Sequence, residues 1–257
     1  MVNGVIAYVL AFLLTTIIHE MGHWIAGIIS GTNPRIHHNY VEHLNYNISN
    51  NSKSFIALAG PFLSLLQGFY GSWRYSVRDK DTRYSLFLIW FSVLGFNNVL
   101  GYFMMGPLFQ VGDIGKFYQL NDVPIYVQII LCVIAAVGLL FVANRMTKPF
   151  LRFCYDAELL ITPKTRKRFS FTILMLPWMI GSVIVTLLNL PIIARVSIIY
   201  PVMSGFVFIY PWQNSATVTN IMPTRNKAIT RFWVGGFILL LLLVFVFKFV
   251  LPVGIGW

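Results

Sequence analysis

The sequence predicts an all-α fold, a polytopic membrane bundle of about seven transmembrane helices. Hydrophobic residues make up 57% of the 257 residues and charged residues only 11%, whereas about a quarter of an ordinary soluble domain is charged. The mean hydropathy is +0.72. Long apolar runs recur along the chain, each near the length of about 20 residues that a helix needs to cross the bilayer. The lipid bilayer is therefore the expected environment.

The first apolar run covers residues 5–30 and ends at Gly31, which is followed by Asn33 and Pro34. Glycine and proline in this order are typical of a helix stop. Six further helices are expected over residues 55–73, 84–105, 124–143, 169–190, 192–212 and 232–251. Prolines at 191, 201 and 211 punctuate the run at 192–212, which makes it the least regular of the seven.

The connection at residues 31–53 differs from the others because it is rich in asparagine with interspersed apolar residues. Two interpretations stay open for it, a β-hairpin at the membrane surface or a solvated polar loop. It also contains His37, His38 and His43, and histidines in loops are more often solvated than bound to a metal.

The 19 Lys and Arg residues outnumber the eight Asp and Glu residues, for a net charge of +11. The basic residues are scattered between apolar runs, which argues against a nucleic-acid partner and favours anionic lipid headgroups. They are densest in the connections at 74–83, 144–168 and 213–231. With seven spans these connections share one side, so the positive-inside rule places them and the N-terminus in the cytoplasm.

Within the first run the sequence reads His19-Glu20-Met21-Gly22-His23. Residues four apart share one helix face, so both imidazoles can bind one ion while Glu20 serves as general base. The two cysteines lack the spacing of a thiolate site, so a metal here would use histidine and carboxylate. The alternative is a histidine pair that only packs against polar groups, but ionisable groups near the bilayer centre cost about 2.5 to 3.5 kcal/mol and usually mark function.

A catalytic zinc ion needs a third protein ligand and one open position. Asp113 is the best candidate, because it follows an apolar span and lies between Gly112 and Gly115, which allow close backbone approach. The acids in the basic connections are expected to be solvated partners of nearby cations: Asp79 and Asp81 of Arg78 and Lys80, and Asp156 and Glu158 of the cations around them. The predicted metal site therefore lies within the first three spans.

Small residues and two amides mark the second and third spans. Gly60, Ser64 and Gly68 repeat every four residues, which predicts a seam for close helix packing, and Pro61 is expected near the start of its helix. Asn97 and Asn98 lie within an apolar run. Each amide either bonds a neighbouring helix or meets a substrate backbone.

These motifs together resemble the site-2 protease family of intramembrane zinc metalloproteases. The resemblance covers residues 5–115: His-Glu-x-x-His in a membrane helix, Ala59-Gly60-Pro61 in the next, then an asparagine-containing helix leading to a glycine-flanked aspartate. It implies one zinc ion held by His19, His23 and Asp113, with Glu20 as general base. It also implies that Asn97 or Asn98 helps to hold the substrate strand.

The predicted function is hydrolysis of peptide bonds in membrane-embedded or membrane-associated substrates. Residues 1–122 would form the catalytic core and residues 123–257 would add further transmembrane helices. Two alternatives stay open: a metalloprotease with a later glutamate, Glu158, as third ligand, or a non-catalytic receptor, transporter or peptide-binding relative. The loop charges place the metal site toward the non-cytoplasmic side, whereas the resembling family usually has it nearer the cytoplasm.

Overall fold

The structure is a computed structural model that describes the whole chain except residues 79–80, 111, 191–195, 225 and 257. Within the described part, six helices are long and apolar enough to span a membrane. They are α1 (Val2–Ile29), α2 (Asn50–Ser76), α3 (Arg83–Phe109), α5 (Ile125–Arg152), the continuous helix of α6 (Pro163–Ser170), η2 (Phe171–Met175) and α7 (Leu176–Leu188), and α10 (Val234–Phe245) with η4 (Val246–Val250) and η5 (Leu251–Val253). The expected all-α helical bundle is confirmed, and the six long apolar helices are consistent with a membrane protein.

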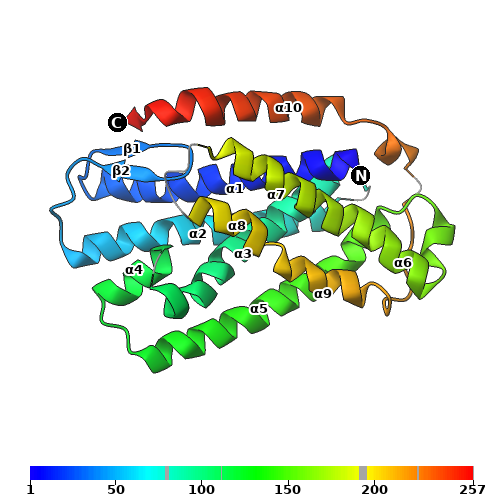
Figure 1. The fold of residues 1–257 in the computed structure, drawn as a ribbon, viewed down its shortest axis with the longest axis horizontal. Coiled ribbons are helices and arrows are strands. Elements are labelled where there is room, and N and C mark those ends of the chain that lie inside the picture. Colours follow the sequence, from blue (N-terminus) through cyan, green and yellow to red (C-terminus); the bar gives the residue numbers. More distant parts are fainter. Residues whose placement is uncertain (79–80, 111, 191–195, 225, 257) are drawn as a thin grey trace.

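The seventh expected span, residues 192–212, is not one long helix in the described part of the chain. It consists of α8 (Val196–Met203) and α9 (Phe206–Asn214), which carry Pro201 and Pro211 in their interiors. Figure 1 shows the two short helices following one another along the bundle. Residues 192–195 lie outside the described residues, and a seventh crossing stays a prediction.

Helix α1 lies at the centre of the bundle and packs against α2, α3, α7 and α10. Its first half is apolar on every side, as expected of a buried helix, and Tyr8 to Ala11 are fully buried. The rings of Tyr8 and Trp90, which comes from α3, meet edge to face with centroids 5.0 Å apart. By contrast, α5 exposes Ile129, Val133 and Val137, which is the surface expected toward lipid.

The predicted seam of small residues is present between α1, α2 and α3. A Cβ on Gly22 would collide with the carbonyl of Ala59, and one on Gly95 would lie 2.7 Å from the amide nitrogen of Gly68. The expectation for Pro61 was wrong. Helix α2 begins at Asn50, because Ser49 caps it by accepting a hydrogen bond from the amide of Ser52 at 3.2 Å, so Pro61 lies inside the helix.

The connection after α1 contains a β-hairpin, as one of the two interpretations predicted, and its place at the membrane surface stays a prediction. Strand β1 (Pro34–Ile36) pairs antiparallel with β2 (Val41–His43), and β3 (Ile255–Gly256) near the C-terminus pairs with the other edge of β1. The sheet lies beside the C-terminal half of α1 (Figure 1).

The three basic connections meet at one end of the bundle, together with the N-terminus. Arg83 donates to the carbonyl of Phe232 at 2.9 Å, Asn226 to that of Asp81 at 3.0 Å and Asn3 to that of Ile229 at 2.9 Å. The sheet and the short helix α4 (Gly112–Leu120) lie at the opposite end (Figure 1). These connections are thus grouped at one end of the fold, and their common side of the membrane stays a prediction.

Candidate metal centre

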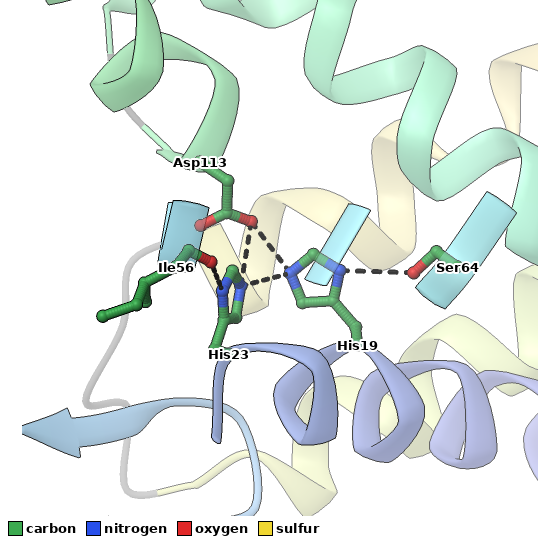
Figure 2. A network of polar contacts seen from close by, with 5 residues as sticks. All are labelled: His19, His23, Ile56, Ser64 and Asp113. Carbon is green, nitrogen blue, oxygen red and sulfur yellow. Dashed lines mark hydrogen bonds and ion pairs between the residues drawn. The ribbon is translucent and has the colours of Figure 1, made fainter. Parts of the chain in front are cut away.

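Three side chains predicted as metal ligands converge from two helices. The Nε2 atoms of His19 and His23, both on α1, lie 3.1 Å apart. Oδ2 of Asp113, at the start of α4, lies 2.9 Å from Nε2 of His19 and 3.3 Å from Nε2 of His23. Figure 2 shows this triangle of donor atoms. The three residues form a cluster that can hold one metal ion.

The far side of each imidazole ring contacts α2 (Figure 2). Nδ1 of His23 donates to the backbone carbonyl of Ile56 at 2.7 Å. Nδ1 of His19 lies 3.2 Å from the hydroxyl of Ser64. Partners of this kind fix the tautomer and orientation of metal-binding histidines. Because a carbonyl can only accept, the Nδ1 of His23 carries the proton and its Nε2 is free to bind a metal.

Two glycines allow α1 and α2 to come close enough for these contacts. A Cβ on Gly60 would collide with Nε2 of His23 and would lie 2.9 Å from Nε2 of His19. Gly22 lies between the two histidines in the sequence, and a Cβ on it would likewise collide, here with the carbonyl of Ala59. The small-residue seam therefore forms one wall of the centre.

Asp113 reaches the histidines through a tight reversal between α3 and α4. Gln110 ends α3 in the left-handed conformation, with φ of 49°, and Gly112 has φ of 73°. A Cβ on Gly115 would lie only 2.6 Å from the carbonyl carbon of Gln110. The glycines around Asp113 thus serve the close backbone approach that the sequence predicts.

The donor atoms open onto a cavity of about 290 Å³, and Glu20 lines this cavity with both histidines and Asp113. Tyr102 of α3 stacks on the ring of His19, with centroids 5.4 Å apart and planes 9° apart. The other residues around the cavity come from the hairpin segment and from α1 to α4, α7 and α8: Phe12, Thr16, Asn39, Tyr40, Val41, His43, Tyr46, Ile56, Ala57, Asn98, Lys116, Asn189, Tyr200 and Pro201.

The two candidate asparagines occupy different environments. Asn97 donates to the carbonyl of Ser204 at 3.4 Å, which is the helix-bonding role. Asn98 lines the metal-site cavity and is 5% exposed. Its side chain interacts with the hydroxyl of Tyr200, while its Oδ1 atom accepts no hydrogen bond from the described residues. Of the two, Asn98 is therefore the amide placed to meet a ligand.

The other acids in the described part of the chain do not join the centre. Glu158 lies in η1 (Ala157–Leu160), which packs on α6 at the basic end of the bundle. Asp81 pairs with Arg152 at 3.2 Å and its side chain is 9% exposed, so the expectation of a solvated partner for Arg78 was wrong. Its expected partner Lys80 lies outside the described residues, as does Asp79.

The three loop histidines have separate environments. His37 lies 3.7 Å from Glu42 and stacks on Tyr40, and His38 meets Phe247 edge to face. His43 lines the metal-site cavity and donates from Nδ1 to the hydroxyl of Thr32 at 2.7 Å. Burial, with His23 and Lys116 nearby, lowers the pKa of His43 to about 4, so its ring is neutral at neutral pH.

Sequence reasoning missed the aromatic wall of the cavity, Tyr102 and Tyr200. Tyr102 lies four residues after Asn98 and therefore on the same helix face, a spacing that could have revealed it. Tyr200 comes from α8, about a hundred residues from Asn98 in the sequence, and no local pattern relates the two. Ser64 was predicted only as part of the packing seam.

Comparison with known proteins adds no assignment: no family model matches the chain, and neither a curated protein nor a solved structure shows significant similarity to it.

Proposed function

We propose that the protein is an intramembrane zinc metalloprotease that hydrolyses peptide bonds of membrane-embedded or membrane-associated proteins. The observation that carries this proposal is the meeting of His19, His23 and Asp113 in a cavity that Glu20 also lines. This arrangement lies among helices long and apolar enough to span a membrane. The resemblance of the sequence motifs to the site-2 protease family supports the same activity.

Zinc fits the donor set better than the hard cations. Two imidazole nitrogens and one carboxylate oxygen are a common ligand combination for catalytic zinc, whereas calcium and magnesium prefer oxygen. Bonds of about 2.0 to 2.2 Å in a tetrahedron place neighbouring ligand atoms about 3.3 to 3.6 Å apart. The three donor atoms lie 2.9, 3.1 and 3.3 Å apart, so a small expansion accommodates the ion.

A zinc ion held by these residues would supply Lewis-acid polarisation of the scissile carbonyl and an increased acidity of water. Glu20 then performs the proton transfers. Its carboxylate takes a proton from the attacking water as the water oxygen bonds to the carbonyl carbon. It returns that proton to the amide nitrogen as the carbon–nitrogen bond breaks, which leaves a carboxylic acid and an amine.

A helical substrate must unwind before attack, because its carbonyls are already hydrogen-bonded. Strand β2 offers a way to hold the unwound segment. Val41 and His43 of β2 line the metal-site cavity. In the sheet order β2-β1-β3, β2 is an edge strand, and an edge can accept an extended peptide by strand addition. Asn98, which lines the same cavity from α3, would contact the substrate backbone.

Replacing the general base tests the proposal directly. Glu20→Gln should lower the cleavage rate of a reconstituted transmembrane test substrate by about 10²- to 10⁴-fold, while the purified protein still contains one zinc ion by metal analysis. Glu158→Gln is the matched control, because Glu158 is exposed on η1 at the basic end of the bundle, away from β2 and the cavity. Wild-type activity in Glu20→Gln would refute the assignment.

Zinc content also identifies the third ligand. Asp113→Asn should lose zinc, whereas Glu158→Gln should retain it, because Glu158 lies at the other end of the bundle. The reverse result would favour the class of metalloproteases with a later glutamate ligand. A wild-type protein that binds zinc but cleaves no membrane substrate would instead indicate a non-catalytic relative.

A further inference from the structure

A second cavity lies beside the metal centre, between α3, α5, α8 and α9. Its volume is about 220 Å³. Apolar side chains and glycines dominate its walls: Gly101, Met104, Met105, Gly112, Leu139, Met203, Phe206 and Val207, with Asn97, Asn98, Tyr102, Tyr200 and Ser204 completing it. We call this cavity the apolar side pocket.

The apolar side pocket adjoins the metal-site cavity. Asn98, Tyr102 and Tyr200 line both, and Tyr102 also stacks on the metal-ligand candidate His19. Asn98 is the buried amide whose Oδ1 atom has no hydrogen-bond partner among the described residues. Leaving such an atom unpaired costs free energy. A substrate backbone amide at this junction would satisfy it and would direct the adjacent side chain toward one of the two cavities.

The size of the pocket fits one side chain. An apolar cavity of about 150 Å³ holds a benzene molecule, and pockets for whole drug-sized ligands start near 300 Å³. A volume of about 220 Å³ therefore suits a leucine, methionine or phenylalanine side chain. Three methionines in the wall add adaptability, because their unbranched side chains adjust to different apolar shapes.

We propose that the apolar side pocket is a specificity subsite that binds one large apolar side chain of the substrate next to the scissile bond. This inference rests on the proposed protease function. It specifies the substrate class further, as a membrane segment with leucine, methionine or phenylalanine beside the cleaved bond rather than glycine or alanine.

Gly101 provides a precise way to fill the pocket. It lines the pocket from α3, and a Cβ built on it meets no atom within 4 Å. A larger side chain therefore enters open space, and replacing a helical glycine favours the helix. In a series of Gly101→Ala, Gly101→Val and Gly101→Leu, kcat/KM for a substrate with phenylalanine at the varied position should fall by about tenfold or more at the leucine step. The same substrate with alanine there should change by less than about threefold.

Gly235→Leu is the matched control. Gly235 lies on α10, where the nearest atom to its Cβ is Nε1 of Trp233 at 4.0 Å, and it lines none of the cavities described above. This variant should leave the preference between the two substrates unchanged. An equal loss for both substrates in Gly101→Leu, or no change for either, would overturn the subsite.

A binding measurement separates this inference from the proposed catalysis. Transmembrane peptides with a diazirine analogue of leucine at successive positions are photo-crosslinked to Glu20→Gln protein, and the adducts are mapped by mass spectrometry. One peptide position should label Met104, Met105 or Leu139, and Gly101→Leu in the same background should abolish that adduct. Labelling elsewhere only would refute the subsite. If the wild-type protein cleaves no peptide but the adduct forms and is lost as expected, the protease function fails and the binding site stands.

Discussion

Contacts with helix α2 set the orientation and tautomer of the His19 and His23 rings. Both present Nε2 to Asp113, while Nδ1 contacts Ser64 or the carbonyl of Ile56. The His-Glu-x-x-His spacing predicts that two rings share a face of α1, but it contains no information on these partners. The hydroxyl of Ser64 can be removed by substitution, whereas the backbone carbonyl of Ile56 cannot.

Ser64→Ala should weaken zinc binding by about 10- to 100-fold, the usual effect of removing a partner of a metal-binding histidine. The reason is that His19 loses the contact from Nδ1 that orients its ring. Competition with a chromophoric chelator in detergent measures the affinity. Ser72→Ala is the matched control on the same helix, because Ser72 contacts Ser92 at 2.7 Å rather than a histidine. Equal affinities in the two variants would contradict the assigned role of Ser64.

Gly60→Ala should abolish stoichiometric zinc binding, because the new methyl group would collide with Nε2 of His23 and displace its ring. Metal analysis of the purified variant measures the loss. Gly101→Ala is the control, since it adds the same methyl group to a transmembrane helix in open space. Retention of one zinc ion in Gly60→Ala would mean that the histidine pair faces elsewhere.

The sequence predicted the candidate ligand cluster largely from local signals. His19, Glu20 and His23 follow from helical spacing, and Asp113 from its glycines and its place after a span. Tyr200 could not be predicted, because it reaches the cavity from α8 through the packing of distant helices. The different environments of Asn97 and Asn98 could be separated only once the neighbours of both were known.

At the scale of elements, glycines on both helices let α2 and α3 pack closely. The repeat of Gly60, Ser64 and Gly68 predicted a seam on α2, but a repeat on one helix does not identify its partner. The structure supplies Gly95 of α3, whose added Cβ would lie 2.7 Å from the carbonyl oxygen of Ser64. The start of α2 was misplaced for a related reason: the polar turn at Asn50 extends the helix beyond the apolar run that hydropathy detects.

Gly95→Ala should lower the free energy of unfolding by about 1 to 3 kcal/mol, the usual cost of overpacking a tight interface. Its methyl group would meet backbone atoms of Ser64 and Gly68, which cannot move aside as a side chain can. Gly101→Ala on the same helix should be neutral or slightly stabilising. Denaturant titration in detergent micelles measures both variants. A Gly95→Ala protein as stable as Gly101→Ala would show that α2 and α3 are farther apart than described.

At the scale of the whole molecule, the basic connections and the candidate metal centre lie toward opposite ends of the bundle. The basic connections and the N-terminus meet at one end, tied by contacts such as Arg83 to Phe232 and Asn3 to Ile229. The hairpin and α4, which flank the metal centre, lie at the other end. The sequence predicted a common side for these connections from a count of seven spans, and the structure shows them at one end of the fold. The prolines marked the run at 192–212 as irregular, but they did not predict that the break between α8 and α9 falls at Ser204 and Gly205.

The orientation in the membrane follows from the same charges and decides from which side a substrate enters. The positive-inside rule predicts that the basic end faces the cytoplasm. Ser76, at the end of α2 beside the basic connection, should then be cytoplasmic, and Ser52, at the start of α2 beside the hairpin, should be on the opposite side.

Single cysteines at these positions test this orientation in a protein whose Cys132 and Cys154 are replaced by serine. A membrane-impermeant maleimide applied to intact cells should label Ser52→Cys, and Ser76→Cys only after permeabilisation. The reverse pattern would place the metal centre toward the cytoplasm, as is usual in the site-2 protease family, and substrates would then reach β2 from that side.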